Sequence, residues 1–154
     1  MIQFSETTNE CLRRAGWTPG LAVDTTSFKE LLTQAGFVAH DPALSFLREF
    51  GGLRIEYPHA RVADMTDEMH FEISIVVKHV VPNDVDAYSR VIGRMLCPIG
   101  EASRGYLVLM MDEQGAVYGA YDDFFAEVGK SGHAAIERLC SGKELKSIPV
   151  GDEW

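Results

Sequence analysis

Histidines and paired carboxylates are the side chains of this chain whose types could support catalysis or metal binding. His70 and His79 flank a segment with the alternation of a strand, and a separation of nine positions would place their side chains on opposite faces. We therefore do not expect them to bind one metal ion. The remaining histidines are expected at helix starts or in a loop, where histidine acts as a capping or surface residue: His40, His59 and His133.

The adjacent acids Asp67-Glu68 and Asp122-Asp123 could hold a cation or act as acid and base. Adjacent side chains usually point apart, however, and no glycine-spaced calcium loop surrounds either pair. The chain also lacks a Gly-x-Ser-x-Gly elbow, a P-loop and a dinucleotide fingerprint. The sequence thus predicts a protein that is not an enzyme, with no catalytic, metal-binding or cofactor-binding residue.

Three cysteines, Cys11, Cys97 and Cys140, are widely spaced and each adjoins a leucine. An odd, scattered set of this kind is typical of small core residues in a reducing compartment rather than of a zinc site. The first residues lack a basic stretch followed by an apolar run, and no segment approaches the roughly 20 apolar residues that span a bilayer. We expect a cytoplasmic protein that does not bind membranes.

The net charge of −9 argues against direct nucleic-acid binding, because that mode depends on clustered Lys and Arg. A basic partner is possible instead. Acids are concentrated in two segments without Lys or Arg, one between Arg61 and Lys78 and one between Arg104 and Lys130. Taken alone, these segments are typical of a solvated acidic surface that aids solubility.

Helical periodicity predicts helices at residues 5–15, 27–35 and 41–50, the second opened by a Ser27 capping box. In the third, Asp41 is the expected N-cap and Pro42 the first helical residue. Gly51 is expected to end this helix in a left-handed conformation, before a strand at residues 53–57 with one buried face.

Further along the chain, apolar alternation at residues 71–77 predicts a second strand after an acidic loop at residues 58–69. A helix is expected to begin at residue 83 or 84, and the segment 95–100 is expected to be a loop or sheet edge because it contains both proline and glycine. The last predicted elements are a hairpin of strands 106–111 and 116–121 and a helix that Ser131 caps; the tail from 143 to 154 receives no assignment.

At 154 residues, the chain is expected to form a single domain over residues 1–154. Helices come first, then strands with one helix between them, then a hairpin and a closing helix. This order predicts an α+β fold with helices packed on a mainly antiparallel sheet of about four to six strands.

Five segments, in this order and spacing, resemble the SUKH superfamily of bacterial toxin-immunity proteins, most closely its third subfamily. The resemblance spans residues 11 to 142, and its specific combination is the helix-Gly-Gly-strand segment together with the Ala-Gly-Trp turn. It implies a SUKH-like α+β fold, in agreement with the order of elements. The segments are Ala15-Gly16-Trp17-Thr18-Pro19-Gly20, Phe46-Leu47-Arg48-Glu49-Phe50-Gly51-Gly52-Leu53, Pro98-Ile99-Gly100, Gly115-Ala116-Val117-Tyr118 and Leu139-Cys140-Ser141-Gly142.

The resemblance implies a binding module that neutralises a cognate polymorphic toxin, often a nuclease or deaminase, and it supplies no catalytic residue. Because the shared motifs coincide with structural elements, the toxin-binding surface is expected in the acidic segments, where an acidic surface would complement a basic nuclease site. The candidate protein-binding residues are Asp64, Asp67, Glu68, Asp122, Asp123 and Glu127. Two alternatives remain: a regulatory protein-interaction scaffold of the same superfamily, and an enzyme with an unrecognised carboxylate site.

Overall fold

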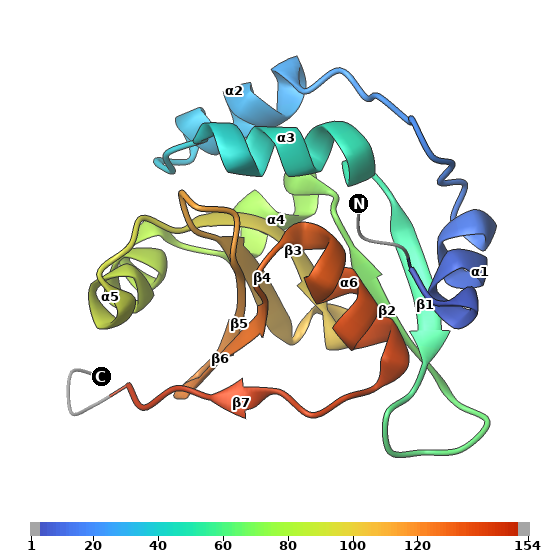
Figure 1. The fold of residues 1–154 in the computed structure, drawn as a ribbon. Coiled ribbons are helices and arrows are strands. Elements are labelled where there is room, and N and C mark those ends of the chain that lie inside the picture. Colours follow the sequence, from blue (N-terminus) through green and yellow to red (C-terminus); the bar gives the residue numbers. More distant parts are fainter. Residues whose placement is uncertain (1–3, 151–154) are drawn as a thin grey trace.

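A seven-stranded antiparallel sheet, in which each strand pairs with the next along the chain, forms the centre of the fold (Figure 1). The computed structural model describes residues 4–150. It confirms the α+β class and the antiparallel sheet, whereas the expected four to six strands were too few. The strands are β1 (Arg54–Pro58), β2 (Thr66–His70), β3 (Cys97–Ala102), β4 (Leu107–Met111), β5 (Val117–Tyr121), β6 (Phe124–Gly129) and β7 (Lys146–Ser147).

Helices cover both faces of this sheet. In Figure 1, α6 lies in front of the strands and α4 behind them, while α3 crosses one end of the sheet. α1 packs on α6 and β1, and α4 packs on α2 and β3. Among residues 4–150, no helix is long and apolar enough to cross a bilayer. The helices are α1 (Glu6–Arg14), α2 (Thr26–Gln34), α3 (Asp41–Phe50), α4 (Ile73–His79), α5 (Pro82–Ile92) and α6 (Gly132–Ser141).

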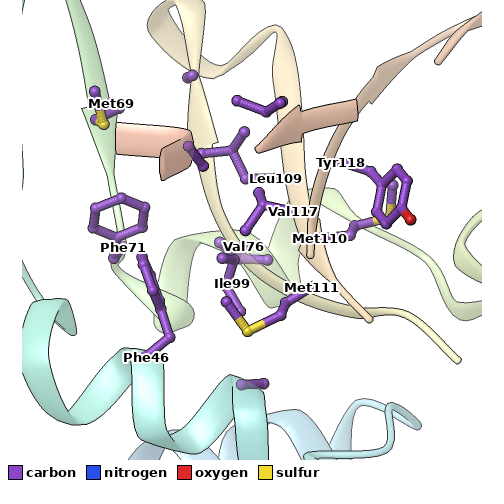
Figure 2. Packing of buried hydrophobic residues seen from close by; sticks show 14 of the residues in the cluster. Phe46, Met69, Phe71, Val76, Ile99, Leu109, Met110, Met111, Val117 and Tyr118 are labelled. Atoms are coloured by element: carbon purple, nitrogen blue, oxygen red, sulfur yellow. The ribbon is translucent and has the colours of Figure 1, made fainter. Parts of the chain in front are cut away.

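An aromatic cluster joins α3 to the sheet. Phe46 points at Phe71, which follows β2, and their ring centroids are 4.9 Å apart (Figure 2). Phe50 is fully buried and lies 5.0 Å from Phe46 and 5.7 Å from the stacked ring of Trp17, also between centroids. Trp17 thus packs back onto the core, as expected for an apolar residue after a glycine that ends a helix.

Both ends of α3 differ in detail from the expectation. His40, rather than Asp41, is the N-cap, and its Nδ1 accepts a hydrogen bond from the Ala43 amide at 3.2 Å. Gly51 has an ordinary φ of −57°, and the left-handed residue is Gly52 with φ +83°. Gly51 is required for space instead, because a Cβ there would collide with the Phe28 ring. The two glycines therefore serve different purposes.

The strand expected at 71–77 is wrong, because α4 occupies Ile73–His79 and β2 lies earlier, in the expected acidic loop. Ile73, Val76 and Val80 are buried, and their spacing of three and four residues is that of one helical face. The same segment also shows apolar alternation, which favoured a strand in the prediction. Charged and polar residues dominate β2 because one of its faces borders a polar groove. Its sequence therefore lacks the apolar alternation of a half-buried strand.

The segment 95–100 is also not a loop or an edge. β3 lies inside the sheet, between β2 and β4, and a shift in register between Pro98 and Gly100 accommodates the proline. β6 and β7 had not been predicted. The expected Ser27 capping box is absent, since α2 begins after Thr25, and it is Asp24 Oδ1 that accepts from the Thr26 amide at 2.9 Å.

The other predicted elements are confirmed. Ser5 caps α1 and Ser131 caps α6, each accepting a hydrogen bond from a backbone amide three residues on. α5 begins at Pro82, close to the expected start, and the predicted hairpin is formed by β4 and β5. Asp112 holds its turn, because its Oδ1 accepts from the Gln114 and Ala116 amides at 2.8 and 3.0 Å.

Replacing Phe50 by alanine is expected to lower the free energy of unfolding by about 3–5 kcal/mol, because the fully buried ring leaves a cavity between α3 and the sheet. Val38→Ala is the control: its side chain is 53% exposed, so a change within about 0.5 kcal/mol is expected. Urea denaturation of both variants measures the difference. Equal stability of the two would contradict the central position given to this cluster.

Candidate functional site

Three connections lie along the end of the sheet that is away from α3. Successive strands of an antiparallel sheet run in opposite directions, so every second connection falls at the same end. These are the β1–β2 loop, the 3-10 turn η1 (Ser103–Gly105) between β3 and β4, and the two-residue β5–β6 turn. Figure 1 places the first and last of them at the lower end of the sheet. We call residues 59–65, 103–106 and 121–123 the tip.

The tip combines exposed carboxylates with exposed apolar side chains. Asp64, Asp122 and Asp123, from two segments far apart in the sequence, are all exposed there. The exposed fraction reaches 76% at Tyr106 and 49% at Tyr121. Of the seven large hydrophobic residues exposed within residues 4–150, four belong to the tip: Val62, Met65, Tyr106 and Tyr121. Exposed large apolar side chains concentrated at one end of a fold are typical of a protein interaction site.

Specific backbone conformations fix the shape of the tip. Within residues 4–150, all four non-glycine residues with positive φ lie in it: Asp64, Ser103, Arg104 and Asp122. Two hydrogen bonds hold these turns: the Tyr88 hydroxyl donates to the Asp122 carbonyl oxygen at 2.7 Å, and Arg104 donates to the Thr66 carbonyl oxygen at 2.9 Å. Left-handed non-glycine residues persist only where surrounding structure enforces them, and they gather at functional sites.

The other predicted site residues lie beside the tip or away from it. Asp67 and Glu68 are adjacent in β2, and the Asp67 carboxylate accepts a hydrogen bond from the Glu68 amide at 2.8 Å. The Glu68 carboxylate forms an ion pair with Arg54. Glu127 lies further along β6, 3.5 Å from Lys130. The structure thus places the aspartates of the two segments at the same end of the sheet, in turns that β3 and β4 separate, and it does not gather all six candidates there.

A polar groove of about 460 Å³ adjoins the tip, between β1, β2, β3 and α4. Glu101, only 1% exposed, lies at its base. His70 Nε2 is 2.8 Å from Glu101 Oε1, and His79 Nδ1 is 3.0 Å from Oε2. The residues that line this groove are Arg54, Glu56, Thr66, Asp67, Glu68, His70, Ile75, His79, Glu101, Arg104 and Gly105.

The expectation that His70 and His79 lie on opposite faces is therefore wrong. The chain between them turns and forms α4 instead of continuing as a strand, which brings both rings to one carboxylate. Within the described part of the chain, no group of three or more His, Cys, Asp or Glu residues has the arrangement of a metal site.

The two histidines favour an ionised Glu101. The Glu72 amide donates to His70 Nδ1 at 3.1 Å, so in the neutral ring Nε2 carries the proton and donates to Glu101. Burial acts to raise the pKa of Glu101, but the hydrogen bonds from His70 and His79 outweigh it and the pKa falls below its ordinary value of 4.5. The Glu101 carboxylate at the base of the groove is thus ionised at neutral pH.

The remaining histidines and the cysteines have structural positions. His40 caps α3, and its Nε2 lies 2.9 Å from the Met111 carbonyl oxygen. His59 Nδ1 accepts from the Arg61 amide at 3.0 Å within the β1–β2 loop, and His133 in the first turn of α6 lies 2.8 Å from Glu49. The cysteines are free and buried, which confirms their expected place in the core: Cys11, Cys97 and Cys140.

Three residues of the tip and the groove were not predicted as functional from the sequence: Tyr106, Tyr121 and Glu101. Tyr106 and Tyr121 stand at the boundaries of the predicted hairpin strands, and an antiparallel pairing already places those boundaries at one end. The predicted hairpin alone therefore indicated that the two tyrosines lie at the same end of the sheet. Glu101 gave no such signal, since its environment depends on the helix α4 that had been predicted as a strand.

Glu101→Gln is expected to lower the free energy of unfolding at pH 7 by about 1.5–3 kcal/mol, because it removes a buried charge that accepts two hydrogen bonds. A depressed folded-state pKa contributes stability above the unfolded-state value of 4.5, and that contribution is lost as pH falls through the folded-state value. The difference from wild type should therefore shrink below pH 4.5. Chemical denaturation across pH 3–7, with exposed Glu10→Gln as the control, tests this; a difference independent of pH would contradict it.

Comparison with known proteins identifies the family. The family model described as SUKH-3 immunity protein matches residues 4–142 of the 154. No curated protein and no solved structure matches the chain. The match covers the helices, the groove and the tip, and it confirms both the expected superfamily and the expected third subfamily. This chain therefore belongs to the SUKH-3 immunity protein family.

Proposed function

We propose that this protein binds a cognate bacterial polymorphic toxin and neutralises it in the cytoplasm of the cell that makes both. Membership of an immunity protein family supports a toxin as the partner. The observation that carries the choice of surface is the tip, where exposed carboxylates and exposed tyrosines lie together. In this proposal the protein acts by binding, without catalysis, a cofactor, or direct contact with nucleic acid or membrane.

The charge of this surface favours a nuclease or deaminase domain as the toxin. Such domains hold phosphate backbones through basic surfaces, which an acidic surface complements and steers toward encounter. The tip and the groove together carry seven carboxylates against three guanidinium groups. The carboxylates belong to Asp64, Asp122, Asp123, Glu56, Asp67, Glu68 and Glu101, and the guanidinium groups to Arg54, Arg61 and Arg104.

The tyrosines would supply affinity. Tyrosine is enriched among the few interface residues that carry most of the binding energy, because its ring offers a large, rigid contact area. Tyr106 and Tyr121 are exposed at the β4 and β5 ends of the tip, and the ring centroid of Tyr121 stacks 5.4 Å from that of Phe124. Tyr121 is therefore held in place before a partner arrives, which reduces the entropy cost of binding.

An enzyme with a carboxylate site remains the second candidate, because the groove holds an ionisable residue with a shifted pKa. The direction of that shift argues against it: a lowered pKa makes Glu101 a weaker base at neutral pH, whereas carboxylates that act as general acids or bases have raised values. A regulatory scaffold would bind several partners and would lack a toxin gene beside its own. No contact in the structure favours it over a single toxin.

Removing charge from the tip is expected to slow toxin association by about tenfold at low ionic strength, because steering depends on the carboxylates. The variant combines Asp64→Asn, Asp122→Asn and Asp123→Lys, since asparagine tolerates the positive φ of the first two positions. Stopped-flow association with the toxin domain encoded beside this gene measures the rate constant, and co-expression measures protection.

The matched control is Glu10→Gln with Glu30→Gln and Asp86→Lys, which changes the net charge by the same amount on exposed helical positions. It should retain association rates near wild type. Unchanged toxin binding and protection in the tip variant would contradict the proposal that the tip is the toxin-binding surface.

Truncating the tyrosines is expected to act on dissociation. Tyr106→Ala and Tyr121→Ala should each weaken toxin binding by about 2 kcal/mol, or about thirtyfold in Kd, if they occupy the centre of the interface. Met95→Ala, also exposed but outside the tip, serves as the control. Surface plasmon resonance separates the two rate constants. Equal Kd values for all three variants would show that the tip tyrosines are not anchors.

A further inference from the structure

We infer that the groove beside the tip receives one basic side chain, an arginine or lysine, of the toxin domain. This inference rests on the proposed function and extends it to a specificity pocket. Thr66, Arg104 and Gly105 line the groove and lie within or next to the tip. A partner seated on the tip would therefore present its side chains directly to the groove opening.

The size of the groove suits a single long side chain. Its volume of about 460 Å³ lies within the range of roughly 300–1,000 Å³ that holds small ligands. Its walls come from rigid elements, with Glu56 on β1, Glu68 on β2 and Ile75 on α4. Ile75 offers an apolar surface for the methylene groups of such a side chain, whose charged end would lie among the carboxylates.

The charge of the groove favours a cation over an anion. Both of its guanidinium groups already have partners, since Arg54 pairs with Glu68 and with Glu72, while Arg104 donates to the Thr66 carbonyl oxygen. Arg54 is therefore neutralised, whereas Arg104 has no ionic partner within residues 4–150; the two guanidinium groups face four carboxylates among the lining residues. Of these carboxylates, Glu56 is exposed and has no ionic partner within residues 4–150.

Glu101 is the group that an incoming cation would approach at the base. Its Oε1 accepts from His70, whose side chain is only 7% exposed, and its Oε2 accepts from His79, whose side chain is 56% exposed. His79 can therefore turn toward solvent while His70 stays in place. That movement leaves Oε2 open to a guanidinium or ammonium donor, which forms a stronger, charge-assisted hydrogen bond.

The test uses a probe that does not depend on any toxin. N-acetyl-arginine amide is titrated into the ¹⁵N-labelled protein, and N-acetyl-citrulline amide, which has the same shape without the charge, is titrated in parallel. We expect saturable shifts of the backbone amide signals of groove residues with the arginine probe only, with a Kd in the millimolar range. Glu56→Gln should raise that Kd about threefold, whereas Glu10→Gln on α1 should leave it unchanged.

Equal binding of the citrulline probe, shifts confined to residues outside the groove, or no saturation with the arginine probe would each overturn the inference. Saturable binding of inorganic phosphate in the groove would overturn it too, because it would show an anion site. Failure of this test leaves toxin binding at the tip intact, since that is measured separately. Conversely, loss of toxin binding in the tip variant does not alter the response of the groove to the arginine probe.

Discussion

The arrangement of this protein depends on the packing of α3 against one end of the sheet. Phe46 and Phe50 hold the helix to Phe71, and Trp17 closes over Phe50 from the segment after α1. Close contact is possible because Gly51 has no side chain to collide with Phe28. The helix and its connections thus cover the end of the sheet at which β1 begins and β2 finishes. The opposite end stays open.

The strand order determines which connections lie at that open end. A sheet in which every strand pairs with the next places alternate connections at the same end, so Asp64 and Asp122, about sixty residues apart in the chain, both lie at this end. Tyr88 on α5 supports this end of the sheet through a hydrogen bond to the carbonyl oxygen of Asp122. The stable core and the proposed binding surface are therefore built at opposite ends of the same strands, which allows the tip to vary without disturbing the aromatic cluster.

Elements with caps, glycine stops and clear periodicity were predictable from the sequence, as α1, α3, α6 and the β4–β5 hairpin show. The strand–helix exchange at residues 66–79 was not, because α4 contains a run of β-branched residues and β2 owes its polar residues to the groove. Contacts with the rest of the fold, rather than local propensity, determined the secondary structure of both segments. For the same reason, the tip aspartates could be selected from charge alone, whereas the contact of Glu101 with two histidines could not.

The central claim is that the tip forms the toxin interface. Hydrogen–deuterium exchange of the protein, alone and bound to the toxin domain encoded beside its gene, measures this directly. The account predicts that toxin binding slows exchange of backbone amides at residues 59–65, 103–106 and 121–123, while α1 and α2 exchange as in the free protein. Slowed exchange confined to the helices, with the tip unchanged, would contradict it.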